Sequence, residues 1–233
     1  MSHASFLNPA LPTYLWHLLP LDELYKLDTF LGGGLWCAES STIVAFEGDI
    51  EDQLPYGIFM SCWHVNQVPS LKAWEIFAAK GRGLALRTNI QTMQHLVRSI
   101  ELPDWKINFG PVDYVDTENK VVQPFAVARS HNHESEARLV ISVDKTNTLD
   151  NYAADRADSF ARYHSRDQVA RFDSISLVGE ARAEAIILPI HPVTFIEEIL
   201  VGWLTTEEER DLLTRRLDSY GLAHKLRVAQ RPI

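Results

Sequence analysis

Two glutamates and an arginine alternate in one short segment, as Glu134, Glu136 and Arg138. On a β-strand, side chains two positions apart point to the same face, roughly 6.5 to 7 Å from each other. Two carboxylates held this close move each other's pKa apart, and a neighbouring guanidinium favours the ionised form. One carboxylate then stays ionised while the other acts as a base or accepts a hydrogen bond from a sugar hydroxyl. The alternative interpretation is a solvated strand face with its own salt bridge.

Histidines beside this segment raise the question of a metal site. His131, His133 and Glu134 lie within four residues of each other. On a strand, however, the two imidazoles point to one side and Glu134 to the other, and no Cys-x-x-Cys or His-x-x-x-His pair completes a tetrahedral set. We therefore expect no metal cofactor, and a metal-dependent hydrolase built on these residues stays as an alternative function.

Two further residues stand where predicted strands end. Trp63 comes just before a loop, so one face of its ring is expected to be exposed. Arg87 ends a short apolar segment and is either a surface residue or a clamp for an anion. Gly32–Gly34 and Gly81–Gly83 each follow a predicted helix, which is typical of helix termination rather than of a phosphate-binding loop.

Apolar periodicity predicts the elements that must position these residues. Strands are expected over residues 13–19, 35–38, 57–65, 84–87, 107–115, 125–128, 134–143, 183–190, 195–201 and 222–228, and helices over 22–31, 70–80, 90–100 and 206–220. Residues 147–172 alternate in charge and are expected to form an irregular surface excursion with a short helix. Strands and helices mix without strict alternation and without a linker. The sequence therefore predicts one α+β domain over residues 1–233, with a mixed, mostly antiparallel sheet and several flanking helices.

The overall charge restricts the classes of partner. The 233 residues include 22 Lys and Arg against 31 Asp and Glu, which gives a net charge of −9. This balance argues against broad binding to nucleic acid or anionic membranes, although one basic groove on an acidic body is compatible with it. Two cysteines make no disulfide framework, and no segment is typical of a signal peptide or a membrane span. We expect a cytoplasmic protein, and the sequence makes no prediction of its oligomeric state.

Several short segments follow one another in a specific order over residues 13–228. They are Leu35-Trp36, Ser61-Cys62-Trp63, Ala73-Trp74, Gly83-Leu84-Ala85-Leu86-Arg87, Val112-Asp113-Tyr114, His133-Glu134-Ser135-Glu136-Ala137-Arg138 and Phe195-Ile196-Glu197-Glu198-Ile199. In this order the chain resembles the bacterial family designated domain of unknown function 2971. It departs from that family in the early loop, where Ser40-Ser41-Thr42-Ile43 replaces an Asn-Asp-Pro motif. The resemblance implies, as one alternative, a ligand-sensing or protein-interaction module of a bacterial stress or phage-defence system.

The order of the polar residues is also similar to that of the ADP-ribosyltransferase fold. That fold places a His or Arg on its first strand, a Ser or Tyr on a middle strand, and a Glu, often within Glu-x-Glu, on a late strand. The matching residues here are His17, then Ser61 with Trp63, and then Glu134 with Glu136. The similarity implies a nucleotide ligand, with NAD as the co-substrate.

This second resemblance also implies a role for each matching residue. His17 would orient the dinucleotide, while Ser61 and Trp63 would form the nicotinamide pocket. Glu136 would stabilise the oxocarbenium-like charge. Glu134 would position or activate the acceptor, and Arg138 would hold the two carboxylates. The hypothesis requires the first strand, the Ser-Cys-Trp strand and the double-glutamate strand to line one cleft.

Overall fold

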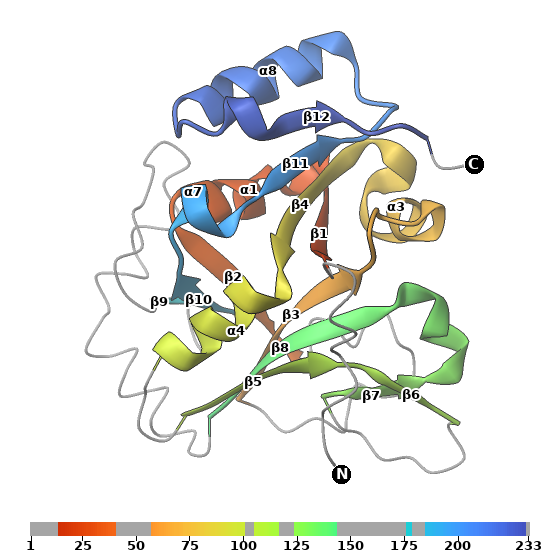
Figure 1. The fold of residues 1–233 in the computed structure, drawn as a ribbon, viewed down its shortest axis with the longest axis vertical. Coiled ribbons are helices and arrows are strands. Elements are labelled where there is room, and N and C mark those ends of the chain that lie inside the picture. The colour runs from red at the N-terminus through yellow and green to blue at the C-terminus, as the bar shows by residue number, and fades with distance from the viewer. Residues whose placement is uncertain are drawn as a thin grey trace.

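A ten-stranded sheet forms the centre of the structure. The computed structural model describes residues 14–40, 57–100, 105–116, 124–143, 176–178 and 185–231. Eight strands follow one another in the order β12-β11-β4-β1-β3-β2-β10-β9, while β8 pairs with β3 and β5 pairs with β8 (Figure 1). Only β11 and β12 are parallel among the pairs described in this sheet. The predicted α+β class with a mixed, mostly antiparallel sheet is therefore confirmed.

The elements have the following bounds. The main sheet contains β1 (Tyr14–Pro20), β2 (Gly34–Glu39), β3 (Ile58–Val65), β4 (Gly83–Asn89), β5 (Trp105–Pro111), β8 (Glu136–Val143), β9 (Ser176–Val178), β10 (Ala185–Pro189), β11 (Glu198–Val201) and β12 (Leu226–Val228). A separate parallel pair is formed by β6 (Asp113–Val115) and β7 (Ala126–Ala128). The α-helices are α1 (Leu24–Leu31), α3 (Leu71–Phe77), α4 (Ile90–Ser99), α7 (Pro192–Phe195) and α8 (Glu207–Asp218). The 3-10 helices are η2 (Leu21–Glu23), η3 (Ala79–Gly81), η4 (Arg129–Glu134) and η6 (Ala223–Lys225).

Four predicted strands differ clearly in their bounds from the strands of the structure. The strand expected over 222–228 is only β12, because residues 223–225 form η6. The strand expected over 107–115 is two strands, because the chain pairs with β8 up to Pro111 and with β7 from Asp113 onward. The strand expected over 195–201 starts only at Glu198, since Pro192 opens the short helix α7. The strand expected over 134–143 starts at Glu136. The excursion predicted over residues 147–172 lies outside the described residues.

Strand β3 has more neighbours than an ordinary central strand. Its one edge pairs with β8 from Ile58 to His64. Its other edge is shared, because β2 pairs with Phe59 and Met60 while β1 pairs with His64 and Val65. The sheet therefore forks along this edge, and the backbone of residues 61–63 lies between the two branches.

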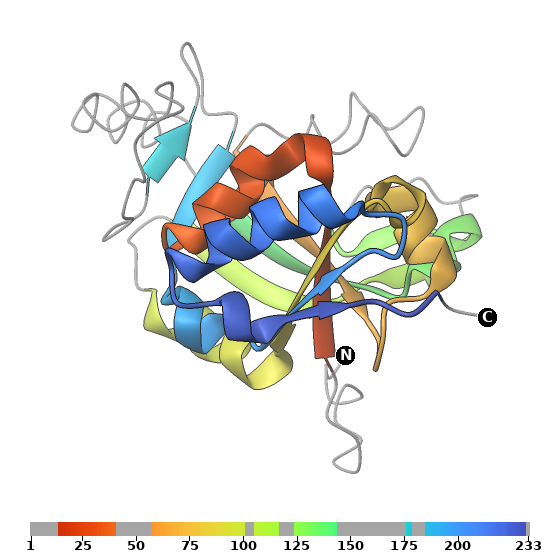
Figure 2. The same cartoon turned by 90° about the horizontal axis from the view of Figure 1, so that it is seen from above.

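The two faces of the sheet carry different cores. In antiparallel pairs, residues opposite each other share a face. One face, here called the inner face, carries the larger apolar core, to which α1, α4 and α8 contribute buried side chains. Figure 2 shows α1 and α8 side by side, and Arg216 of α8 forms an ion pair with Asp28 of α1. The other, outer face packs Trp16 and Ala85 against Trp74 of α3. Within the described ranges, no helix is long and apolar enough to cross a bilayer.

Candidate functional site

The double-glutamate segment is a turn followed by a strand. Glu134 ends η4, and Ser135 has a φ of +46°, in the left-handed region that non-glycine residues rarely adopt. Only from Glu136 onward does the chain run as β8. The prediction that Glu134 and Glu136 alternate on one strand face is therefore wrong, because Ser135 changes the direction of the backbone between them.

Glu136 and Arg138 form a buried, bidentate ion pair on the outer face. The Arg138 Nε–H donates to Glu136 Oε1 and the Nη2–H donates to Oε2, both at 3.0 Å. Arg138 also donates from Nη1 to the Pro124 carbonyl at 3.0 Å. The two residues are 9% and 3% exposed. Both oxygens of Glu136 are thus engaged, so its carboxylate holds β8 and Arg138 in place.

Glu134 is the centre of a second set of hydrogen bonds. Its Oε1 accepts from the Nδ1–H of His131 at 2.9 Å. Its backbone carbonyl accepts from the Nδ1–H of His64 at 2.5 Å, while His64 Nε2 accepts from the Ser70 N–H at 3.3 Å. Burial lowers the pKa of His64, which agrees with a neutral ring that both donates and accepts. The expectation that His131 and Glu134 point to opposite sides fails, because they are three residues apart in a 3-10 helix.

Tyr114 contacts the first residue of β8. Its hydroxyl oxygen accepts from the Glu136 N–H at 2.8 Å. Burial raises the pKa of Tyr114 to about 12, so the hydroxyl keeps its proton at neutral pH. We call Tyr114, His131, Glu134, Glu136 and Arg138 the carboxylate cluster.

The carboxylate cluster has the groups needed for acid–base chemistry. Glu134 fixes the Nδ1–H tautomer of His131, which leaves Nε2 as the nitrogen that takes up a proton. Tyr114 supplies a hydroxyl proton, and Arg138 supplies a fixed positive charge. Part of the His131 side chain is exposed to solvent, and that of Glu134 is less exposed. Among the described residues, no group of three or more His, Cys, Asp and Glu side chains is arranged to hold a metal ion.

His17, Ser61 and Trp63 also lie together, but on the inner face. The rings of His17 and Trp63 are 5.1 Å apart between centroids, and Trp63 Nε1–H donates to Ser61 Oγ at 3.1 Å. Trp63 is only 1% exposed, since Phe30 and Phe195 pack against its ring. The prediction that one face of Trp63 is exposed is therefore wrong.

The sheet itself lies between these two groups of residues. Trp63 is opposite Ala137, and the neighbouring pair of His64 and Glu136 points to the other face. The prediction that His17 and the glutamates line one common cleft is therefore wrong. Side-chain alternation on β3 and β8 places them on opposite faces.

His17 occupies the fork of the sheet. It donates from Nδ1 to the Cys62 carbonyl at 2.9 Å, in the stretch of β3 between the β1 and β2 pairings. Burial is the main cause that lowers the pKa of His17 from 6.5 to about 4. The imidazole is therefore neutral at physiological pH and acts there as a hydrogen-bond donor to the backbone.

This pKa makes stability depend on pH. Between pH 6.5 and about 4, the unfolded chain binds a proton at His17 that the folded protein does not. The free energy of unfolding therefore falls as the pH is lowered through this range, by at most about 3 kcal/mol. Urea titrations at several pH values measure this. The variant His17→Asn should make the free energy of unfolding depend less steeply on pH. A slope of the same sign remains, because the pKa of buried His64 is also lowered. The control variant His95→Asn, at an exposed position, should keep the wild-type pH dependence. An unaltered pH dependence in His17→Asn would contradict the assignment.

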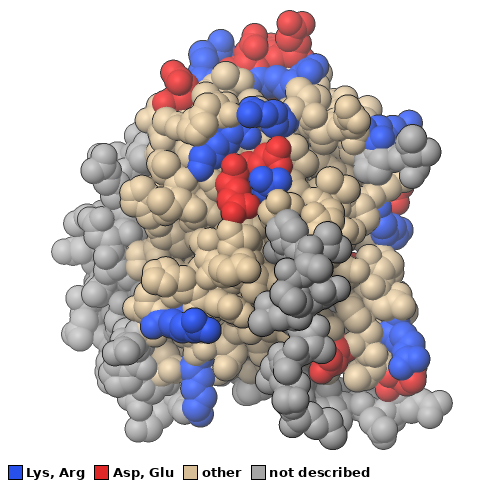
Figure 3. All heavy atoms as spheres, viewed as in Figure 1, with Lys and Arg blue, Asp and Glu red and all other residues tan. Residues whose placement is uncertain are grey.

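Arg87 lies on the outer face among aromatic rings and carboxylates. Its guanidinium lies 4.3 Å from the centroid of Tyr14 and 5.6 Å from that of Trp16. It pairs with Glu197 at 3.3 Å and with Glu198 at 2.7 Å. In the view of Figure 3, acidic and basic side chains gather over the region of β11. Carboxylates of the chain itself thus occupy the position that an anionic ligand would need.

Sequence reasoning missed two residues of the carboxylate cluster and its surroundings. Tyr114 falls on a predicted strand with no chemical role assigned to it, and His64 falls within the strand predicted over residues 57–65. Their contacts join segments 22 and 70 residues apart, which no local pattern encodes. Comparisons with family models, with curated proteins and with solved structures found no match to this chain.

Proposed function

We propose that this chain is an NAD-using transferase of the ADP-ribosyltransferase type, with its reaction at the carboxylate cluster. The observation that carries the proposal is the convergence of His131, Glu134, Tyr114 and the Glu136–Arg138 pair at one end of β8. The reaction class follows from the late position of Glu134 and Glu136 in the chain, whereas His17, Ser61 and Trp63 lie on the opposite face of the sheet and take no part in the proposed site. The geometry revises the residue roles, because both oxygens of Glu136 are held by Arg138.

In this reaction the bond between the ribose C1′ and the nicotinamide nitrogen breaks, and its electron pair leaves with neutral nicotinamide. Positive charge develops on the ribose ring, where the carboxylate of Glu134 stabilises it. The acceptor's oxygen or nitrogen then bonds to C1′ and gives its proton to Nε2 of His131. Tyr114 donates its hydroxyl proton in a hydrogen bond to the substrate. Glu136 and Arg138 are positioning residues, which fix the start of β8.

A second candidate function is ligand sensing without catalysis. It is supported by the same ion pair, since a carboxylate whose two oxygens are bound by an internal arginine is typical of a structural contact. In that case the exposed part of His131 and Glu134 would bind a ligand and leave it unchanged.

Labelled NAD distinguishes the two functions. We expect the wild type to release nicotinamide with a suitable acceptor, and His131→Asn and Glu134→Gln to lower the rate by roughly 10²- to 10⁴-fold, the usual contribution of acid–base groups. His95→Asn, an exposed histidine on α4, is the matched control and should keep the wild-type rate. Thermal unfolding of each variant checks that the fold is kept.

Each other outcome decides against one candidate. NAD binding without turnover in the wild type supports ligand sensing and contradicts transfer. Equal turnover by His131→Asn and the wild type removes His131 from the mechanism. The absence of both NAD binding and turnover contradicts the transferase function.

A further inference from the structure

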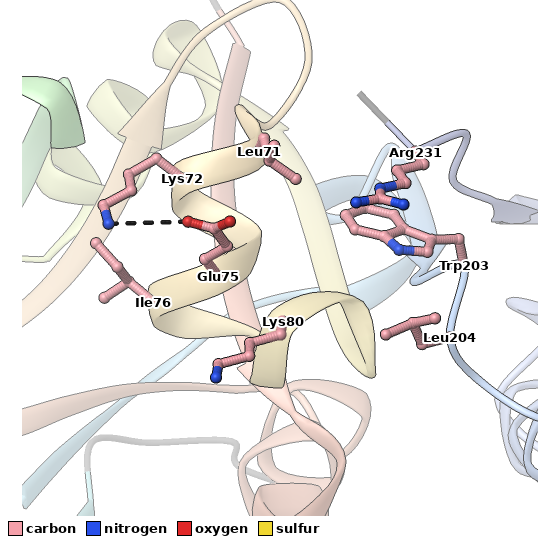
Figure 4. Close-up of a pocket in the computed structure, with 8 residues that line it drawn as sticks. All are labelled: Leu71, Lys72, Glu75, Ile76, Lys80, Trp203, Leu204 and Arg231. Carbon is pink, nitrogen blue, oxygen red and sulfur yellow. Dashed lines mark ion pairs between the residues drawn. The ribbon is translucent and has the colours of Figure 1, made fainter. Parts of the chain in front are cut away.

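A hollow lies between α3 and the chain that follows β11. Leu71, Glu75 and Ile76 of α3 form one wall, and Trp203 and Leu204 form the other (Figure 4). The volume is about 540 Å³, within the roughly 300 to 1,000 Å³ range of small-molecule sites. We call this hollow the α3 groove. It shares no residue with the carboxylate cluster.

The α3 groove is basic although the chain is acidic. Lys72, Lys80 and Arg231 line it together with a single acid, Glu75, which pairs with Lys72 at 3.8 Å. Three positive charges against one negative charge leave a net charge of +2 in a protein whose total is −9. This local reversal of sign attracts an anion.

The apolar part of the groove is held rigidly. Trp203 packs edge-on against Trp74, with 5.4 Å between ring centroids. Gly81 lies so close that an added Cβ would be 2.5 Å from Trp203 Cε2, and a Cβ on Gly202 would be 2.2 Å from the Gly81 carbonyl oxygen. Only glycine fits at these two positions. Because these two glycines let the backbone pack closely, the indole of Trp203 is held in one position. Leu204, the next residue, is 57% exposed.

The backbone that carries Lys80 is strained. Ala79 and Lys80 have φ values of +46° and +57°, and Gly81 follows at +95°. Two consecutive non-glycine residues in the left-handed region are unfavourable, and such segments concentrate at ligand-binding sites. The strain is an observation independent of the shape and charge of the groove. The strained segment places Lys80 at the edge of the α3 groove.

We propose that the α3 groove binds a small phosphorylated molecule with a flat apolar ring, that is, a ligand of the nucleotide class. The phosphates contact Lys80 and Arg231, and the ring contacts Trp203 and Leu204. Guanidinium and ammonium groups are the usual partners of phosphate, and aromatic side chains are the usual partners of nucleobases. This site is separate from the carboxylate cluster, and the proposal does not rest on the transferase function.

Calorimetric titration with ADP, adenosine and inorganic pyrophosphate tests the proposal. ADP should bind more tightly than either of the other two, because it alone satisfies both parts of the groove. Lys80→Gln and Arg231→Gln should each weaken ADP binding about fivefold to tenfold. Arg98→Gln, which removes an exposed positive charge on α4, is the matched control and should change nothing. Trp203→Leu should weaken ADP and adenosine while leaving pyrophosphate unchanged.

The variants also separate this site from the proposed active site. Glu134→Gln should leave ADP binding at the groove intact, whereas loss of ADP binding in Glu134→Gln but not in Arg231→Gln would overturn the proposal. Equal affinity for pyrophosphate and ADP would overturn the contact with the ring. No binding of ADP at millimolar concentration, or equal binding by wild type and Arg231→Gln, would overturn the site as a whole.

Discussion

Replacing Arg138 by methionine is expected to lower the free energy of unfolding by about 3 to 5 kcal/mol. The change removes both donors to the carboxylate of Glu136 while that carboxylate stays buried on the outer face. An ionised group without a partner in a buried position costs far more than the ion pair itself contributes. Urea unfolding at pH 7, followed by fluorescence and by circular dichroism, measures the loss.

The partner variant shows where this loss comes from. The double variant Glu136→Leu and Arg138→Met should recover most of the stability, because no buried charge is left unpaired. Recovery would show that the loss in Arg138→Met comes from the unpaired charge of Glu136. A single variant Arg138→Met that loses less than about 1 kcal/mol would contradict the buried, bidentate geometry.

Replacing Trp63 by alanine should lower the free energy of unfolding by a similar amount, about 3 to 5 kcal/mol. Its indole is buried among His17, Phe30 and Phe195 on the inner face, so the change leaves a large cavity at the fork of the sheet. Trp63→Phe keeps most of the volume and should lose less. Tyr25→Ala, an aromatic residue that is largely exposed, is the control and should be close to neutral. Equal effects of Trp63→Ala and Tyr25→Ala would show that the core does not depend on the indole.

The elements that local sequence determines were the ones predicted most accurately. The helix expected from Thr206 is α8, because the Thr206 hydroxyl accepts from the Glu209 N–H and the Glu209 carboxylate accepts from the Thr206 N–H. All residues of such a capping box lie within one turn of helix. Gly81 likewise has the positive φ expected where a helix ends.

The arrangement of the site depends on contacts that local patterns do not encode. Ser135 has no side chain that favours the left-handed region, yet it turns the chain between the two glutamates. The fork of β3 depends on pairings with segments near residues 15 and 38, so no period within β3 predicts it. Alternation did place Arg138 with Glu136 on one face, and in the structure Ser61 and Trp63 share a face of β3. What it left undetermined was that these faces are opposite.

The pairing of β3 also has a consequence for how the protein is made. Val65, the last residue of β3, leaves the ribosome 78 residues before Val143, the last residue of β8, which covers the whole edge of β3. At about 5 to 20 residues per second, that apolar edge stays without its partner for about 4 to 16 s in every nascent chain. During this interval its unpaired backbone amides and carbonyls can form hydrogen bonds with a strand of another chain. Chaperone binding to nascent chains should therefore be strongest between these two points of synthesis.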